Sequence, residues 1–206
     1  MAGEESMNYF EVFGLPRRLE INGAELQRRF YELSRLHHPD FHHGASVEEQ
    51  AAALDVSARL NAAYRALRDP VACIEYLVRL EEGRETREGA VVTPKAPPEL
   101  LAEMFEIQEA LAEAQAGKGS GRLDDATREM LRSQRERLLE RHRDEEARLT
   151  GPLSRAWDAA EGAGRPSVLE AVKQSLATRA YLRTVIADLG EALGEDQGEH
   201  VAHHRH

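Results

Sequence analysis

The stretch Leu26–His42, LQRRFYELSRLHHPDFH, decides the fold. Its first part carries apolar side chains at helical spacing, which predicts one buried helix face formed by Leu26, Phe30 and Leu33. Pro39 disfavours helical backbone at the residue before it, so we expect this helix to end near His37. The tripeptide His38–Asp40 then lies in a loop.

Histidines gather around this loop, so a metal site has to be weighed. Helical metal ligands commonly stand at i and i+4. His38 and His42 have that spacing, but Pro39 breaks the helix that would align them. A metal-dependent hydrolase at His37–His43 would need further partners, and His142 is the only other histidine before the tail. We keep the hydrolase as a weak alternative to solvated histidines, and we expect no catalytic residue, no metal and no cofactor.

The flanking sequence predicts helices on both sides of the loop. NYFEVFG gives a short helix that ends at Gly14, and Asn22 with Glu25 resembles a capping box at the start of the next one. Ser46 with Glu49 starts the helix after the loop, and RDP closes it. Its buried side is expected to carry Ala53, Ser57, Leu60, Tyr64 and Leu67. Pro70 then opens a short fourth helix.

Composition restricts the function. The chain has 206 residues, 41% hydrophobic content, 5% aromatic residues and a net charge of −10. This charge argues against a nucleic-acid binder. A single cysteine, Cys73, excludes a disulfide within the chain and any site built from several cysteines. No apolar run reaches the ~20 residues needed to span a bilayer, and MAGEESMNYF does not resemble a signal peptide. We therefore expect an all-α, cytoplasmic protein.

A change in composition divides the chain. Residues 81–98, EEGRETREGAVVTPKAPP, have no helical period and contain two glycines and three prolines, as a linker does. The predicted organisation is a helical domain at 1–80, a linker at 81–97, a three-helix bundle at 98–194 and a disordered tail at 195–206.

Three helices are expected in the second half. ELLAEMFEIQEALAEAQ has a buried stripe at Leu100, Met104, Ile107, Leu111 and Ala114. Leu101 and Phe105 lie to one side of the stripe; periodicity alone leaves open whether they form an exposed strip or widen the buried face. A long charged helix follows, bent or ended near Gly151–Pro152. Ser167 and Glu170 are expected to cap a last helix, whose apolar positions are Val168, Val172, Leu176, Leu182, Ile186, Leu189 and Leu193.

Over about residues 7–80 the sequence resembles a J domain, on the segments NYFEVFGLP, LQRRFYELSRLHHPDFH and SARLNAAYRALRDPVACIEYL. This resemblance implies an antiparallel helical hairpin that presents His38, Pro39 and Asp40 to a DnaK-like chaperone and stimulates its ATPase. It also implies a basic patch at Arg28, Arg29 and Arg35. A merely solvated helix face explains these arginines equally well.

A J domain followed by such a bundle resembles the HscB family of co-chaperones in iron–sulfur cluster assembly, over about residues 7–193. The family's activity implies two partners, the chaperone HscA and the cluster scaffold IscU. The net charge and the lack of a long apolar run lead us to expect no nucleic-acid or membrane partner. By position, the residues facing IscU are Leu101, Ala102, Phe105, Glu106, Glu109 and Tyr181. Ala102 departs from the larger apolar residue usual there, which implies weaker docking or a shift of the contact to Phe105. Because the apolar pair Leu101 and Phe105 does not identify the client, a J-domain adaptor for a different client stays an alternative.

Overall fold

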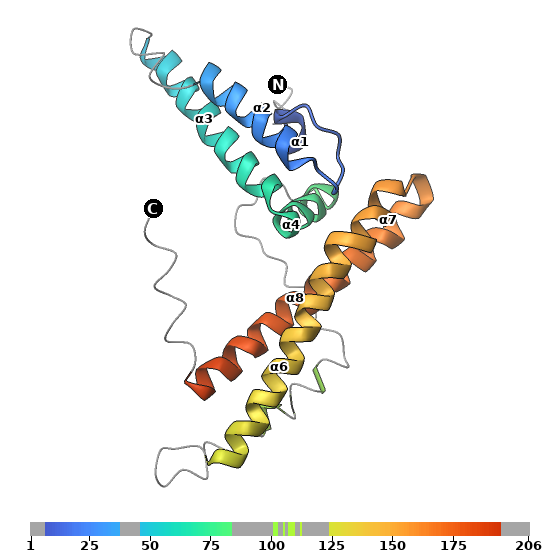
Figure 1. Ribbon diagram of the computed structural model, residues 1–206. Coiled ribbons are helices and arrows are strands. Elements are labelled where there is room, and N and C mark those ends of the chain that lie inside the picture. The colour runs from blue at the N-terminus through green and yellow to red at the C-terminus, as the bar shows by residue number, and fades with distance from the viewer. Residues whose placement is uncertain are drawn as a thin grey trace. The chain divides into compact units, whose positions relative to one another are not determined.

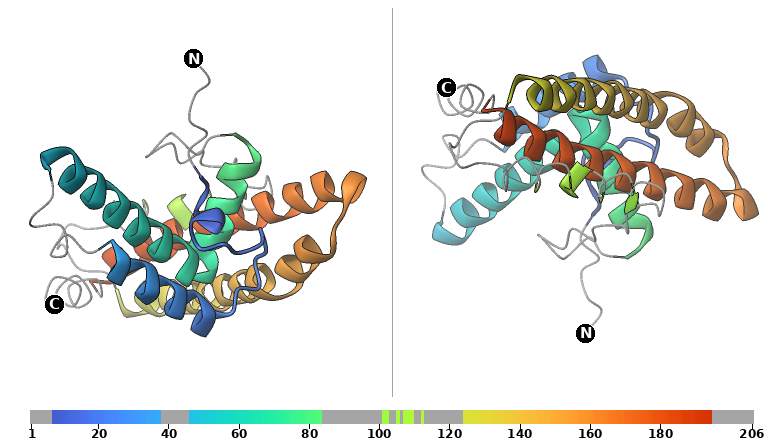
Figure 2. Two further views of the ribbon diagram at one scale, coloured as in Figure 1. Left: turned by 90° about the horizontal axis from the view of Figure 1, so that it is seen from above. Right: turned by 90° about the horizontal axis from the view of Figure 1, so that it is seen from below.

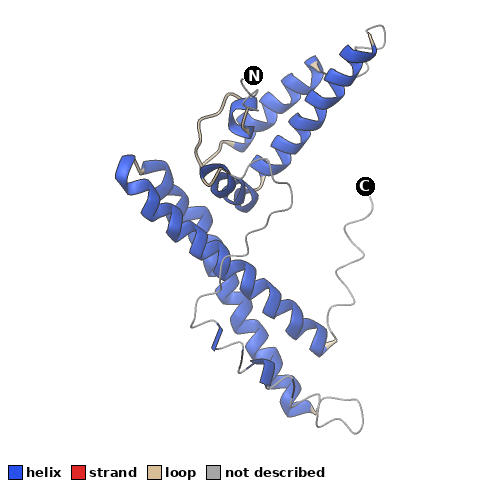
Figure 3. Cartoon of the chain, turned by 180° about the vertical axis from the view of Figure 1, so that it is seen from behind, coloured by secondary structure: helices blue, strands red, loops and turns tan. Residues whose placement is uncertain are grey.

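The computed structural model describes residues 7–37, 46–83, 101–102, 105, 107–109, 112 and 124–194. Within these ranges every regular element is a helix, as Figure 3 shows, and the predicted all-α fold class is confirmed. None of the described helices is long and apolar enough to cross a membrane. By contacts, the chain forms two compact units: residues 1–90 with 149–169, and residues 91–148 with 170–206. The first unit therefore includes a segment from late in the sequence.

A helical hairpin dominates the first unit. Helices α2, Gly23–Leu36, and α3, Val47–Arg68, run side by side in opposite directions (Figures 1 and 2). The ring of Phe30 stacks on that of Tyr64, with centroids 4.2 Å apart. Both helix starts agree with the sequence. Asn22 caps α2 by accepting hydrogen bonds from its first turn, although Glu25 pairs with Arg29 and does not complete the predicted capping box. Ser46 and Glu49 form a reciprocal capping box at the start of α3.

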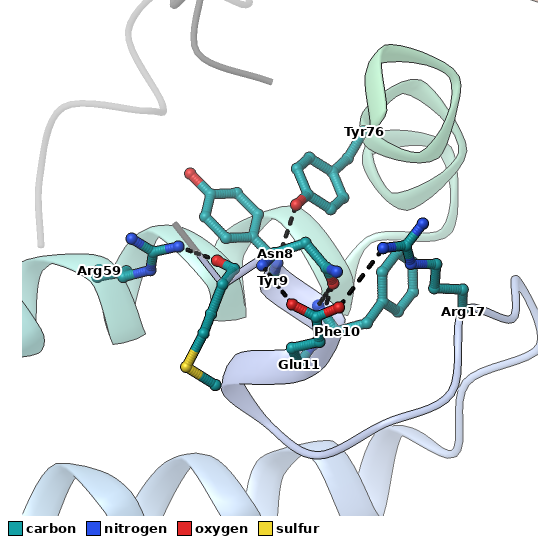
Figure 4. Close-up of polar contacts among 8 residues, drawn as sticks. Asn8, Tyr9, Phe10, Glu11, Arg17, Arg59 and Tyr76 are labelled. Carbon is teal, nitrogen blue, oxygen red and sulfur yellow. Dashed lines mark hydrogen bonds and ion pairs between the residues drawn. The ribbon is translucent and has the colours of Figure 1, made fainter. Parts of the chain in front are cut away.

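Helix α1, Tyr9–Val12, is short and held by polar contacts at its start (Figure 4). Asn8 and Glu11 form a capping box. The backbone N–H of Tyr9 donates to the hydroxyl of Tyr76 at 2.8 Å, and Arg59 donates to the carbonyl of Met7. Phe10 is completely buried. A helix of four residues has little stability of its own, so these contacts with α3 and α4 fix it.

Helix α4, Pro70–Glu81, closes the hairpin. Asp69 caps it and Pro70 occupies its first position, where a missing N–H costs nothing. Its buried residues are Val71, Cys73, Ile74, Tyr76, Leu77 and Val78. Burial, with smaller contributions from Asp158 and Asp69, raises the pKa of the Cys73 thiol to about 12. The thiol therefore stays protonated and unreactive at neutral pH.

Residues 149–169 bring a second set of contacts to the first unit. A π-helix, Leu149–Leu153, contains Pro152, and the hydroxyl of Ser154 donates to the carbonyl of Leu149 at 2.7 Å. The predicted interruption of the long charged helix near Gly151–Pro152 is confirmed. The π-helix packs against α4, and α7, Ser154–Ala159, follows it.

Asp158 of α7 holds the loop between α1 and α2. Its two carboxylate oxygens accept hydrogen bonds from consecutive backbone N–H groups, Leu19 at 2.8 Å and Glu20 at 3.0 Å. The side chain of Glu20 also pairs with Arg155 at 3.9 Å. The loop that leads into α2 thus depends on a carboxylate from late in the sequence.

We expect Asp158→Ala to destabilise the protein by about 1–3 kcal/mol, because the partly buried N–H of Leu19 loses its acceptor. Thermal unfolding and the hydrogen exchange rates of the Leu19 and Glu20 amides measure the effect. Asp188→Ala on the exposed side of α8 is the control and should change neither. Unchanged exchange at both amides in Asp158→Ala would contradict the assignment.

The second unit is built on two long helices, α6, Asp125–Arg148, and α8, Arg165–Leu193, which belongs to this unit from residue 170 on (Figure 2). Polar contacts fix their register: the Ser175 hydroxyl donates to Glu145, and Arg179 pairs with Glu146 at 3.0 Å. The apolar core consists of Ile107, Leu131, Leu138, Leu182, Val185, Ile186 and Leu189.

The predicted start of α8 was wrong. Helix α8 begins at Arg165, ahead of the expected cap, and the Ser167 hydroxyl donates to the carbonyl of Gly164 at 3.0 Å. Pro166 in the first turn explains the difference, since its fixed φ favours a helix start at that point.

His142 of α6 has a pKa that its surroundings lower below the ordinary value. Its Nε2 atom is buried and has no hydrogen-bond partner among the described residues. Burial lowers the pKa of His142, the positive charges of Arg179 and Arg183 lower it further, and Glu146 opposes them. The folded state therefore binds a proton less readily than the unfolded state does.

Because the folded pKa lies below the ordinary value of 6.5, the contribution of His142 to stability is complete above about pH 6.5. It is lost as the pH falls through the folded pKa. We expect the free energy of unfolding of the wild type to fall from pH 7.5 to 5 more steeply than that of His142→Gln. Chemical denaturation at several pH values tests this; equal slopes for the two proteins would refute it.

Candidate functional site

Two surfaces carry the residues that the sequence singled out. The first surrounds the segment between α2 and α3. The backbone N–H of His37 donates to the carbonyl of Leu33 at 3.1 Å and ends α2, so the predicted helix end is confirmed. His38, Pro39 and Asp40 lie outside the described residues, and their role stays a prediction. In the sequence they stand between the last residue of α2 and the first residue of α3.

An open groove of about 860 Å³ runs along the outer face of α2, lined by described side chains from Ala24 to Leu36. Two of the predicted contact residues, Arg28 and Arg35, line it. Arg28 pairs with Glu32 at 3.7 Å, and both side chains are more than half exposed. Such exposed pairs contribute little to stability, so Arg28 can exchange this partner for another carboxylate.

Arg29, the third predicted contact residue, makes its hydrogen bonds within the first unit. Its guanidinium donates to the carbonyls of Phe13 and Gly14 and to the carboxylate of Glu25. Gly14 has a φ of +59°, and a Cβ there would meet Nη1 of Arg29 at 3.1 Å. Glycine thus suits both the backbone turn and the space that Arg29 needs. These contacts assign Arg29 a structural role; binding of a partner by Arg29 stays a prediction.

Sequence reasoning missed two exposed apolar residues in this groove, Tyr31 and Leu36. Their side chains are 57% and 68% exposed. The signal was available, because both residues fall outside the predicted stripe of Leu26, Phe30 and Leu33, of which Leu26 is buried and the other two are partly buried.

The second surface lies in the segment from Leu101 to Ala112. Leu101 and Phe105 are 42% and 71% exposed, whereas Ile107 is 6% exposed and belongs to the core. Leu101 and Phe105 are four positions apart and share a helix face. Phe105 and Ile107 are two positions apart, which places them on nearly opposite sides of the helix. The open question is therefore resolved: these two side chains form an exposed strip.

The remaining residues of the second surface differ in position. Ala102 and Glu109 are exposed, and Glu106 lies outside the described side chains. Tyr181 of α8 is partly buried and packs against the same core cluster that contains Ile107. The structure thus connects Tyr181 to this segment through a shared core. Binding of a scaffold by these residues stays a prediction.

Metal chemistry has no support among the described residues, where no group of three or more histidine, cysteine or acidic side chains could hold an ion. Of the cluster His37–His43, the structure describes His37 alone. The hydrolase alternative therefore stays untested at this loop.

Two solved structures share this fold. Chaperone HscB from Vibrio cholerae matches with a TM-score of 0.57 and 23% identity, over 92% of this chain and 99% of that one. Human co-chaperone protein HscB matches with a TM-score of 0.56 and 24% identity, over 93% of this chain and 84% of that one. No protein-family model matches the sequence. At these identities the likeness establishes the fold.

Proposed function

We propose that this chain is an HscB-type co-chaperone of iron–sulfur cluster assembly. Its first unit engages a DnaK-like chaperone, HscA, and stimulates ATP hydrolysis. Its second unit binds the cluster scaffold IscU and brings it to that chaperone. The chain itself carries out no chemistry, and it acts in the cytoplasm.

Two features of this chain together support the proposal: the position of the HPD tripeptide in the sequence, and the fold. His38–Asp40 stands in sequence between the antiparallel helices α2 and α3, in a fold that two HscB proteins share along most of their length. A short HPD sequence is weak on its own, because three residues recur by chance. Its position between these helices, within this fold, makes the motif specific.

The exposed strip of Leu101 and Phe105 supports the second half of the proposal. The exposed side chains of Leu101, Phe105 and Glu109 follow one another at four-residue spacing on one helix face, which supports a docking site there. The small side chain of Ala102 favours an alternative, a different client on the same strip.

One experiment tests both halves of the proposal. The full chain is added to purified HscA, and ATP hydrolysis is measured with and without IscU, while binding of IscU is measured by calorimetry. We expect stimulation of the ATPase and saturable binding of IscU. Stimulation without IscU binding would favour a different client, and absence of stimulation would reject the co-chaperone assignment.

A further inference from the structure

The outer side of α3 is exposed and apolar. Four exposed side chains recur at helical spacing along its first half: Val47, Ala51, Leu54 and Ala58. Val47 and Leu54 are 82% and 56% exposed. At about 100° per residue, this stripe lies nearly opposite the buried positions of the helix, which are Ala53, Leu60, Ala63 and Leu67. Helix α3 therefore has an apolar stripe on its exposed side as well as on its buried side.

Carboxylates run along one flank of this exposed stripe. Residues 47–58 include Glu48, Glu49 and Asp55 and no lysine, arginine or histidine, which gives the segment a net charge of −3. Glu48 and Asp55 are exposed and stand seven positions apart, close to two helical turns, so they lie on the same side of α3 about 10.5 Å apart along its axis. We refer to these two residues and the exposed stripe together as the α3 face.

The groove along α2 carries the opposite charge at the same spacing. Arg28 and Arg35 line it and also stand seven positions apart, beside the exposed side chains of Tyr31 and Leu36. Glu32 lines the groove too and pairs with Arg28 at 3.7 Å, so the groove keeps one net positive charge. Because both side chains of this pair are more than half exposed, Arg28 can exchange Glu32 for another carboxylate at little cost. We refer to Arg28, Tyr31, Arg35 and Leu36 as the α2 face.

We propose that this chain associates with itself, with the α2 face of one copy packed on the α3 face of another. Arg28 and Arg35 then meet Glu48 and Asp55 in two ion pairs at once, because both sets of charges span two turns on one side of a helix. The apolar side chains of the two faces cover one another beside these ion pairs. Both halves of a complementary contact are present in one chain, which identifies a second copy as the occupant. The inference does not depend on the proposed function.

The kind of assembly follows from the difference between the two faces. A contact between unlike faces is head-to-tail, so each dimer still offers an α2 face at one end and an α3 face at the other, and larger oligomers can grow. Two helix faces form a small interface, and small interfaces are weak. Exposed ion pairs are screened over about 10 Å at 0.1 M salt, so the association should be strongest at high protein concentration and low salt.

Sedimentation velocity of the full chain, from micromolar to near-millimolar protein in low and in high salt, tests the contact. Two charge-reversal variants are compared with the wild type: Arg28→Glu with Arg35→Glu, and Glu48→Arg with Asp55→Arg. Each variant alone is expected to associate at least about tenfold more weakly than the wild type, because like charges then face each other across the contact. An equimolar mixture of the two variants is expected to associate as the wild type does, since each reversed face finds its complement on the other variant.

Glu129→Arg with Glu136→Arg is the matched control. These two exposed carboxylates of α6 also stand seven positions apart and belong to neither face, so their reversal should leave the association of the wild type unchanged. Thermal scans verify that every variant is folded. Where a reversal lowers the melting temperature, the neutral changes Glu48→Gln with Asp55→Asn take its place, and these should weaken the association as well.

Three results would overturn the inference. A wild type that stays monomeric at every concentration in low salt has no such contact. Association that both charge-reversal variants retain in full does not use these two faces. Failure of the folded variants to associate when mixed shows that the α2 face and the α3 face do not meet each other. Loss of association in each variant alone, with recovery in the mixture, supports the head-to-tail contact.

Discussion

Asp40→Asn is expected to abolish stimulation of the chaperone ATPase while the melting temperature of the protein stays within about a degree of the wild type. The substitution keeps the shape of the side chain and removes its negative charge. A hydrogen bond from a cation on the partner to this carboxylate is worth about 1.5–3 kcal/mol. Loss of that bond weakens the contact by roughly 10- to 150-fold, which is enough to eliminate stimulation at micromolar concentrations.

Steady-state ATP hydrolysis by the chaperone, measured against increasing concentrations of each variant, tests this. Asp55→Asn provides the matched control, because Asp55 is an exposed carboxylate on α3 and stands 15 positions after Asp40 in the sequence. It should stimulate as the wild type does. Full stimulation by Asp40→Asn would remove the J-domain assignment, since that assignment gives the carboxylate of Asp40 a direct contact with the chaperone.

Local chemistry explains why most helix ends could be predicted. Asn22 and Ser46 accept hydrogen bonds from N–H groups within three residues, and Gly14 ends the first helical segment with a positive φ. Such signals act over one helical turn, so the sequence alone contains them. Ser167 with Glu170 has the same spacing as Ser46 with Glu49, but Pro166 started the helix earlier. A capping pattern alone therefore does not fix where a helix starts, because a proline close by can start the helix at another residue.

Contacts between distant parts of the chain could not be predicted. Asp158 and Leu19 are 139 positions apart, and nothing in the sequence near either residue indicates their hydrogen bond. Arg29 looked like its neighbours Arg28 and Arg35 because helical spacing does not reveal the carbonyls of Phe13 and Gly14. The fold decides which charged side chains remain available for a partner.

For the second surface, periodicity left two readings of Leu101 and Phe105, and solvent exposure distinguished them. The stripe through Ile107 predicted a buried side, but its width depends on how many helices pack around the segment. One sequence cannot give that number. With Phe105 at 71% exposure, its burial must come from a partner if it is buried at all.

Leu101→Ala with Phe105→Ala is expected to raise the Kd for IscU about a hundredfold and to leave the fold intact. A side chain that becomes fully buried at an interface contributes roughly 1.5–3 kcal/mol. Leu101 is already partly covered, with 42% exposure, so about 3 kcal/mol is expected for the pair. Calorimetric titration of IscU into the full-length variant measures the change, and a thermal scan verifies the fold.

Two control variants distinguish a loss of binding from a loss of stability. Ile107→Ala empties a core position and should cost about 2–5 kcal/mol of stability, with early melting. Met130→Ala removes an exposed apolar side chain of α6, 45% exposed, and should change neither melting nor binding. If the Leu101/Phe105 variant melts as Ile107→Ala does, the strip supports the fold and the predicted scaffold contact loses its basis. If it melts normally and still binds IscU, the scaffold docks elsewhere. Stimulation of the ATPase in the absence of IscU should be unaffected, because these residues belong to the second unit and the HPD tripeptide belongs to the first.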